Sequence, residues 1–288
     1  MAAVNKRDFE LAADDGYRLQ ATLFEPSEQS ARPLVIMASA TGVPQGYYAR
    51  FATFLAEHGR PVVTFDPRGI GRSAPASLKG FECRFRDWAI KDFPGAIDWA
   101  QRTYPGRPLH WVGHSYGGFG LGLARNNGAV EKLLGVSTMT ADARLVDNKL
   151  GALQIGVMLF GVGPLVARTL GYVPGRLFGG TGLPRGVVLE WSQWCRTPGF
   201  LFGVDDLPER QHFKTLTADV RLTFVTDDGW LGKRGVDHLL QQFSAARSRD
   251  LWTIEPHDGA GHAIGHLGFF RSQFRDTLWP KALGWLDA

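Results

Sequence analysis

Pro108-Leu109-His110-Trp111-Val112-Gly113-His114-Ser115-Tyr116-Gly117-Gly118 is the stretch that decides the fold. Its first five residues form a short apolar run typical of a buried strand, and the small residues after Gly117 are suited to begin a tightly packed helix. A serine between them, flanked by glycines in a G-x-S-x-G pattern, predicts a sharp turn that projects the Ser115 hydroxyl beyond the sheet edge. Glycine is required beside such a turn because larger side chains would collide with the neighbouring strand or helix. In a chain with 36 glycines the motif alone carries little weight, so the rest of the sequence has to supply its context.

Strand and helix patterns alternate along most of the chain. The expected strands are residues 33–38, 61–65, 108–112, 130–138, 220–225 and 251–254, and the expected helices are 48–58, 87–102, 236–243 and 269–285. Pro94 is expected to break or bend the second of these helices. Asp14-Asp15-Gly16 lies between two alternating segments and predicts an N-terminal hairpin. This order implies an α/β fold with a mostly parallel central sheet and helices on both faces.

The alternation stops near Thr140 and resumes after Phe213. We interpret residues 140–213, which are rich in glycine and aromatic residues, as a helical lid inserted into a core formed by residues 1–139 and 214–288. The most apolar part, residues 150–170, approaches the length of a membrane span but contains four glycines, a proline and an arginine, which favours a lid helix with an apolar face. The candidate substrate-binding side chains are Trp191, Trp194 and His114.

Composition excludes several classes of protein. Of 288 residues 44% are apolar, which is enough for a large core and argues against global disorder. The net charge of +4 is small and scattered, so no nucleic-acid partner is expected. Cys83 and Cys195 are too few for a disulfide framework, and the first ten residues lack an apolar segment of signal-peptide length. These features favour a cytoplasmic protein without a membrane span, and both a monomer and a homo-oligomer fit the sequence.

The chemistry of Ser115 requires an acid and a base elsewhere in the chain. A serine hydroxyl is a weak nucleophile at neutral pH, so a base must remove its proton and a carboxylate must orient that base. Where the serine occupies such a turn, the chain order is serine, acid, histidine. Asp227 and Asp228 follow the strand expected at 220–225. We favour Asp228 because it lies further along the loop, whereas Asp227 could cap or brace the turn.

Three histidines follow the last expected strand: His257, His262 and His266. We favour His266 as the base because it lies between glycines on a loop just before a helix, and His262, which also follows a glycine, is the alternative. With Asp258 the three histidines could also be metal ligands. Gly261 and Gly265 argue against the helix that such a cluster would need, and no H-E-x-x-H motif occurs, so no metal or other cofactor is expected.

Attack by a serine on a carbonyl group produces an oxyanion, which preorganised backbone N–H groups must stabilise. One such group is expected from Tyr116, the residue after the nucleophile. The second is expected from the loop after the strand at 33–38, where we favour Thr41, with Ala40 as the alternative.

Taken together, these residues resemble the α/β-hydrolase superfamily, and the likeness spans about residues 9–285. Residues 66–73 are similar to the D-x-R-G-x-G-x-S turn of many members. The nearest resemblance is to a bacterial group close to the serine aminopeptidase-like and monoglyceride-lipase-like branches. Its members carry A-T-G-V-x-x-x-x-Y (here 40–48), G-H-S-x-G-G, a D-D pair and G-H-x-G-F-F. The resemblance implies the α/β-hydrolase fold and a triad of Ser115, Asp228 and His266. Many members have His-Gly where this chain has Ser39-Ala40, which leaves the shape of the oxyanion site open.

The expected function is that of a serine hydrolase acting through an acyl-enzyme. The aromatic, apolar lid favours a carboxylic ester with a hydrophobic acyl or aryl group, so the expected partner is a small ester molecule. Peptidase or amidase activity and acyl transfer use the same triad and stay open. The alternative from another class is a non-catalytic α/β-hydrolase scaffold that binds a ligand without turnover.

Overall fold

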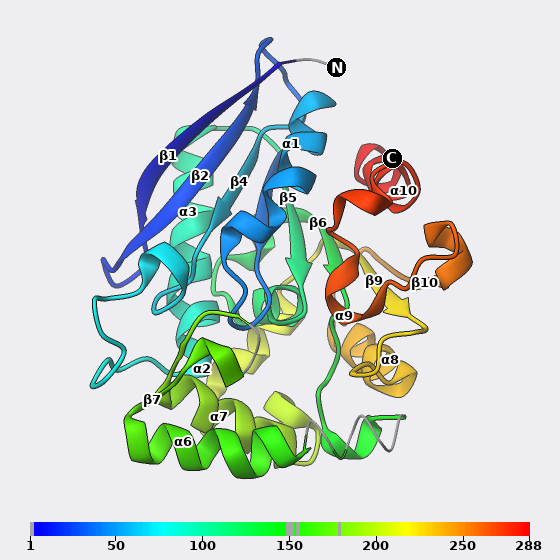
Figure 1. Ribbon diagram of the computed structural model, residues 1–288. Helices are drawn as coiled ribbons and strands as arrows, with labels where there is room; N and C mark the ends of the chain where they lie inside the picture. The colour runs from blue at the N-terminus through cyan, green and yellow to red at the C-terminus, as the bar shows by residue number, and fades with distance from the viewer. Residues whose placement is uncertain (1–2, 148–152, 154–155, 178–179) are drawn as a thin grey trace.

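The computed structural model describes residues 3–147, 153, 156–177 and 180–288. An eight-stranded sheet in the order β1-β2-β4-β3-β5-β6-β9-β10 forms its centre (Figure 1). The strands of this sheet are β1 Val4–Ala12, β2 Arg18–Pro26, β3 Leu34–Ala38, β4 Val62–Phe65, β5 Leu109–His114, β6 Val130–Val136, β9 Asp219–Val225 and β10 Ser248–Ile254. Two further strands, β7 Tyr172–Val173 and β8 Leu183–Pro184, pair only with each other.

The helices lie between and around these strands. The α-helices are α1 Ala49–Glu57, α2 Phe85–Asp87, α3 Phe93–Thr103, α4 Tyr116–Phe119, α6 Gly163–Leu170, α7 Arg185–Arg196, α8 Lys233–Gln242, α9 Gly265–Gly268 and α10 Leu278–Asp287. Two segments are π-helical, Trp88–Asp92 and Val157–Val162. The 3-10 segments are Gln45–Tyr48, Gly71–Ser73, Gly120–Leu123, Asn127–Ala129, Ala143–Leu145, Gly175–Leu177, Phe200–Gly203, Pro208–Lys214, Pro256–Gly259 and Ser272–Phe274.

The sheet has the predicted mixed character. Strands β4, β3, β5, β6, β9 and β10 run parallel, while β2 is antiparallel to β4 and to β1. The hairpin predicted at Asp14-Asp15-Gly16 joins β1 to β2, and Gly16 takes the positive φ of 82° that the turn requires. Figure 1 shows α1 in front of the sheet and α3 behind it, which confirms the prediction of helices on both faces.

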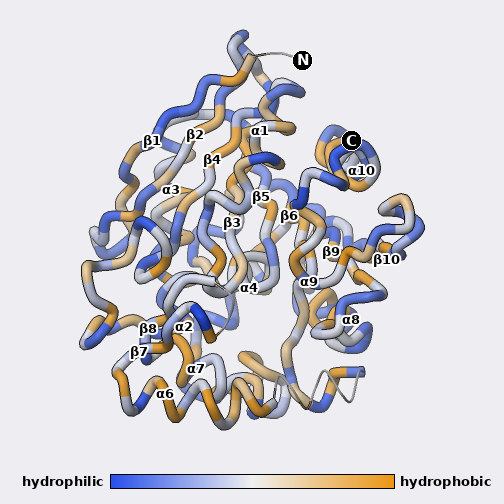
Figure 2. The backbone as a smooth tube through the Cα atoms, in the orientation of Figure 1, coloured by the Kyte–Doolittle hydropathy of each residue, from blue (hydrophilic) through white to orange (hydrophobic). Residues whose placement is uncertain are grey.

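In this sheet the buried central strands are hydrophobic and the exposed edge strand is hydrophilic. Every residue of β3, β4 and β5 is buried, as expected for parallel strands that helices cover on both faces. The edge strand β1 instead carries a hydrophilic run and is largely exposed (Figure 2). The predicted continuous apolar runs therefore mark the centre of the sheet.

The segment between β6 and β9 adds no strand to the central sheet within the described residues. Its helices α6 and α7 gather beyond the carboxyl ends of the central strands, where a lid would lie (Figure 1). Part of the predicted lid helix at 150–170 is present, as a π-helical turn followed by α6, while residues 148–152 and 154–155 lie outside the described residues. The boundaries 140–213 stay a prediction.

Three details differ from the sequence-based expectations. Pro94 does not end the helical stretch, which continues to Thr103, but the backbone changes from the π-helical turn Trp88–Asp92 to the α-helix α3 directly before the proline. The helix after Gly117 is a single turn that continues as 3-10, and a Cβ at Gly122 would lie 2.3 Å from the Phe213 ring. The last helix begins at Leu278 rather than 269.

Candidate active site

Ser115 occupies the sharp turn that the motif predicts. It has φ 51° and ψ −110°, and it joins the end of β5 directly to α4. Its N–H donates to the Val136 carbonyl at 2.8 Å, and its own carbonyl accepts from Thr138 Oγ1 at 2.7 Å. These bonds to the end of β6 hold a conformation that residues other than glycine rarely adopt.

The glycines around Ser115 are required by close backbone contacts. A Cβ on Gly113 would lie 2.2 Å from the Gly117 carbonyl oxygen, and a Cβ on Gly117 would lie 2.2 Å from the Ala38 carbonyl oxygen. Both distances are far below a van der Waals contact, and both involve backbone atoms that cannot move aside. The G-x-S-x-G pattern is therefore a packing requirement of the β5–α4 turn.

An aspartate–histidine pair faces the same region. His266 Nδ1 donates to Asp228 Oδ2 at 2.7 Å, and the second oxygen, Asp228 Oδ1, accepts the Trp230 N–H at 2.8 Å. The Asp228 side chain is fully buried, so this carboxylate has fixed partners on both oxygens. Because a carboxylate accepts the Nδ1 proton, the lone pair of His266 is on Nε2, the nitrogen that a base would use.

Asp227 has a different task from its neighbour. Its two carboxylate oxygens accept the N–H groups of Ile264 and Gly265, at 2.8 and 2.9 Å. Asp227 therefore braces the backbone at the start of the segment that carries His266, while Asp228 contacts the imidazole itself. His266 was expected on a loop, and the structure places it instead in the short helix α9, which Gly265 enters with φ 58°.

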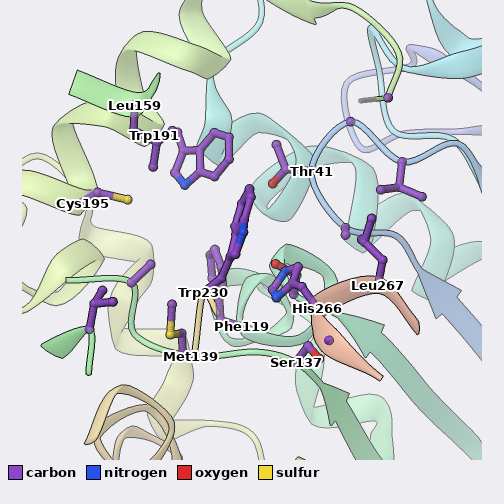
Figure 3. A pocket seen from close by; sticks show the side chains of 18 of the residues that line it. Thr41, Phe119, Ser137, Met139, Leu159, Trp191, Cys195, Trp230, His266 and Leu267 are labelled. Carbon is purple, nitrogen blue, oxygen red and sulfur yellow. The ribbon is translucent and has the colours of Figure 1, made fainter. Parts of the chain in front are cut away.

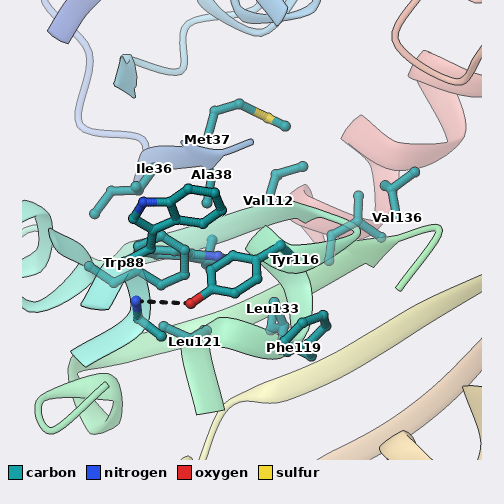
Figure 4. Packing of buried hydrophobic residues seen from close by; sticks show 14 of the residues in the cluster. Ile36, Met37, Ala38, Trp88, Val112, Tyr116, Phe119, Leu121, Leu133 and Val136 are labelled. Atoms are coloured by element: carbon teal, nitrogen blue, oxygen red, sulfur yellow. Dashed lines mark hydrogen bonds between the residues drawn. The ribbon is translucent and has the colours of Figure 1, made fainter. Parts of the chain in front are cut away.

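The two candidate oxyanion donors come from the start of α4 and from the loop after β3. Tyr116 N–H stands at the start of α4, and the Tyr116 ring is anchored in the core by its hydroxyl, which contacts the Ala89 N–H at 3.1 Å (Figure 4). Thr41 lines the cavity. The alternative donor, Ala40 N–H, is already bonded to Tyr48 Oη at 2.9 Å. This arrangement favours Thr41 over Ala40.

A cavity of about 430 Å³ brings these groups together. Ser115, His266 and Thr41 all line it, and most other lining residues are apolar or aromatic. The apolar and aromatic contributors include Val43, Phe85, Phe119, Met139, Leu159, Phe160, Leu183, Trp191 and Trp230. In Figure 3, Trp230 lies between Trp191 and His266. Such a lining suits a hydrophobic group adjacent to the serine.

Of the three expected substrate-binding residues, one lines the cavity. Trp191 does so and stacks on Phe85 with ring centroids 5.6 Å apart. Trp194 and His114 were placed there by the sequence analysis, but both are fully buried and neither belongs to the lining. Trp194 packs against Phe85 and Phe200, with ring centroids 5.3 and 5.6 Å away.

Trp230 is a site residue that the sequence analysis missed. Its ring stacks on the His266 imidazole, with centroids 5.2 Å apart and planes 22° from parallel, and 42% of the residue is exposed. Its position two residues after Asp228 was a signal that could have identified it.

Other reactive side chains are less suited to this chemistry. Cys195 lines the cavity, but burial raises the pKa of its thiol well above the ordinary value, so the nucleophilic thiolate is disfavoured. His262 is exposed, and His257 contacts Glu255 at the surface, at 3.1 Å between Nδ1 and Oε2. Among the residues that the structure covers, no group of three or more His, Cys, Asp or Glu is placed to hold a metal ion. Within the same residues, none of the helices has the length and apolar character needed to cross a membrane.

The fold and the position of Ser115 define an α/β hydrolase. The chain belongs to the alpha/beta hydrolase family, whose model matches residues 35–272. A search of the curated proteins gave no match.

Solved structures share the fold. A soluble variant of monoglyceride lipase from Saccharomyces cerevisiae, in complex with a substrate analogue, matches with a TM-score of 0.67 at 16% identity, covering 99% of this chain and 95% of that one. An esterase of Pyrococcus furiosus matches with a TM-score of 0.64 at 14% identity, over 99% and 90% of the two chains. The esterase domain of a Rhodothermus marinus protein matches with a TM-score of 0.61 at 16% identity, over 98% and 97%. At these identities the likeness establishes the fold, and the reaction has to be argued from the site.

Proposed function

We propose that the protein is a serine hydrolase that cleaves carboxylic esters with a hydrophobic acyl or aryl group. The observation that carries the proposal is the 2.7 Å contact of His266 with the buried Asp228, in a cavity that Ser115 also lines. A serine on a turn of positive φ, a histidine with a free Nε2 and a buried carboxylate are the parts that acyl transfer requires. The mainly apolar cavity supports the choice of substrate class, and the esterase and lipase names of the similar structures agree with it.

In the proposed reaction, His266 Nε2 takes the proton of the Ser115 hydroxyl while Oγ attacks the ester carbonyl carbon. The carbonyl oxygen becomes an oxyanion, which the N–H groups of Thr41 and Tyr116 stabilise. When the tetrahedral intermediate collapses, the bond to the alcohol oxygen breaks and His266 returns the proton to the departing alcohol. The acyl group stays on Ser115.

Deacylation repeats the sequence with water as the nucleophile. His266 Nε2 removes a proton from water, whose oxygen attacks the acyl carbon, and the proton then passes to Ser115 Oγ as the acid leaves. Asp228 remains ionised throughout and stabilises the imidazolium that forms in each half-reaction. We also propose a cytoplasmic location, which the two free, buried cysteines support.

A fluorophosphonate probe tests the nucleophile most directly. The wild-type protein should be labelled once, and Ser115→Ala should not be labelled at all. A p-nitrophenyl ester should give a burst of p-nitrophenol followed by turnover, because the acyl-enzyme accumulates. Absence of labelling in the wild type, or equal labelling of Ser115→Ala, would contradict the proposal.

Substrate class is tested with esters of increasing acyl length and with matched amides. Hydrolysis that is faster for apolar acyl chains than for acetyl, and faster for esters than for amides, is the expected outcome. Faster amide cleavage would replace the esterase assignment by an amidase. Labelling without turnover of any ester, with ligand binding retained, would indicate a binding scaffold.

A further inference from the structure

A buried tyrosine–histidine pair lies directly beneath the candidate active site. Tyr48, in the 3-10 segment before α1, and His114, the last residue of β5, are 1% and 0% exposed. Tyr48 Oη lies 2.8 Å from His114 Nδ1. Neither residue lines the cavity, so neither has a place in the reaction described above.

The pair is bonded at both ends to loops that carry functional groups. At one end, Tyr48 Oη accepts the Ala40 N–H at 2.9 Å, in the peptide next to Thr41. At the other end, His114 Nε2 lies 2.8 Å from the backbone carbonyl oxygen of His266. His114 is also the residue immediately before Ser115.

The direction of each bond is fixed by chemistry. A carbonyl oxygen only accepts, so His114 Nε2 must carry the proton, and Nδ1 of the neutral ring must accept from the Tyr48 hydroxyl. Burial, followed by the proximity of His266, lowers the pKa of His114 to about 3, which agrees with a neutral ring. The result is one continuous chain of donors from Ala40 N–H through Tyr48 and His114 to the His266 carbonyl.

Aromatic packing holds this chain in place. The Phe270 ring contacts both members, with centroids 5.0 Å from Tyr48 and 5.1 Å from His114. A hydrogen-bond chain inside an apolar environment is stronger than its equivalent in water, and a broken link leaves buried polar groups without partners.

We propose that Tyr48 and His114 are positioning residues that fix the oxyanion loop and the loop of the base relative to the nucleophile. This inference rests on the proposed serine hydrolase function. In this proposal the His114 imidazole, adjacent to Ser115 in the chain, sets the distance between the Thr41 N–H and the His266 ring. Displacement of a catalytic group by about 1 Å lowers turnover by about 100-fold, so a tie of this kind affects rate more than substrate binding.

The test uses Tyr48→Phe, His114→Leu and His114→Gln. Tyr48→Phe removes the acceptor for Ala40, and His114→Leu removes both bonds of the imidazole. His114→Gln restores a donor near the position of Nε2, toward the His266 carbonyl. With a p-nitrophenyl ester, Tyr48→Phe and His114→Leu should lower kcat by about 10- to 100-fold while KM stays within about threefold of the wild type. His114→Gln should recover a large part of the loss.

A boronic acid that forms a tetrahedral adduct with Ser115 gives a second measurement. Its Ki should rise in parallel with the fall in kcat, because it depends on the same geometry as the transition state. The double variant Tyr48→Phe/His114→Leu should be no slower than the slower single variant if the chain acts as one unit.

Matched controls exist outside the hydrogen-bond chain. Tyr17→Phe removes a tyrosine hydroxyl that donates to the Ser73 carbonyl at 2.7 Å, and His110→Gln alters a buried histidine at the other end of β5. Both should keep kcat near the wild-type value, and melting temperatures measured for all variants separate lost stability from lost geometry.

The measurements distinguish failure of the proposed function from failure of the inference about Tyr48 and His114. If the wild type is neither labelled by the fluorophosphonate nor active on any ester, the proposed function and this inference fall together. If the wild type is labelled and active while Tyr48→Phe and His114→Leu keep kcat and Ki within about threefold, or while KM alone changes, only this inference is overturned. Equal losses in Tyr17→Phe and His110→Gln would also overturn it.

Discussion

The adjacent Asp227 and Asp228 make different contacts: Asp228 accepts from the His266 imidazole, whereas Asp227 accepts two backbone N–H groups. In Asp228→Asn, an amide N–H₂ can face His266 Nδ1 and force the proton onto Nε2, which abolishes the base. We expect kcat to fall by about 10⁴-fold. Asp227→Asn keeps one acceptor for the Ile264 and Gly265 N–H groups, so the loop loosens but the imidazole keeps its carboxylate. We expect a loss of about tenfold. Steady-state kinetics of the two variants test which aspartate orients His266. A larger loss of kcat in Asp227→Asn than in Asp228→Asn would assign that role to Asp227.

Trp230 contributes to the same histidine through its ring. A Trp face stacked on an imidazole favours the imidazolium that forms during the reaction, by about 1 kcal/mol. Trp230→Ala should therefore lower kcat/KM about fivefold. Trp230→Phe should stay closer to the wild type because it retains an aromatic face. The backbone N–H that caps Asp228 is present in both variants, so unchanged kcat/KM in Trp230→Ala would show that the ring has no part in the reaction.

At the scale of elements, the β5–α4 turn depends on close backbone approach. Gly113→Ala would place a Cβ 2.2 Å from the Gly117 carbonyl oxygen, so we expect destabilisation of more than about 3 kcal/mol or failure to fold. Gly284→Ala is the matched control, because no atom lies within 4 Å of the added methyl group in helix α10. That change should stabilise the protein by about 0.5–1 kcal/mol. Urea unfolding of both variants measures the difference, and a fully stable Gly113→Ala would contradict the packing argument.

Helices and strands with a strong periodicity of apolar residues were predicted correctly from the sequence. The ends of elements that depend on tertiary packing were not. The apolar runs of β3 to β6 and the spacing of α1 and α8 were sufficient to predict the mostly parallel sheet. The predicted start of the last helix at residue 269 was wrong, since α10 begins at Leu278 and the buried Phe269, Phe270 and Phe274 precede it.

The candidate site residues also differ in whether the sequence could predict them. Ser115, Asp228 and His266 were proposed from their order in the chain, and the structure brings the last two into contact. His114 was misplaced because β5 is buried on both faces, so alternation along the strand does not show which residue meets the cavity. Trp230 escaped notice because its role depends on a ring contact between two separate loops.

At the scale of the whole molecule, the buried His110 and His114 make the free energy of unfolding depend on pH. Burial is the first cause that lowers the pKa of both His110 and His114 to about 3, while the charge of Arg60 adds to the effect at His110 and that of His266 at His114. In the unfolded chain a histidine titrates near pH 6.5. Between pH 6.5 and about 3 the unfolded state therefore binds protons that the folded state does not. The stabilising contribution is complete above pH 6.5 and is lost as the pH falls.

This linkage predicts how the free energy of unfolding changes in histidine variants. Each buried histidine should account for about 2 kcal/mol of the fall in stability between pH 7.5 and pH 5. His110→Gln and His114→Gln should each reduce that fall by this amount, and the double variant by about twice as much. These proteins contain the same carboxylates, so the difference between their unfolding free energies at the two pH values, measured with urea, reports the histidines. Retention of the full pH dependence in the double variant would show that neither ring is held neutral. The hydrogen-bond directions between Ala40 and the His266 carbonyl, which assume a neutral His114 with its proton on Nε2, would then be wrong.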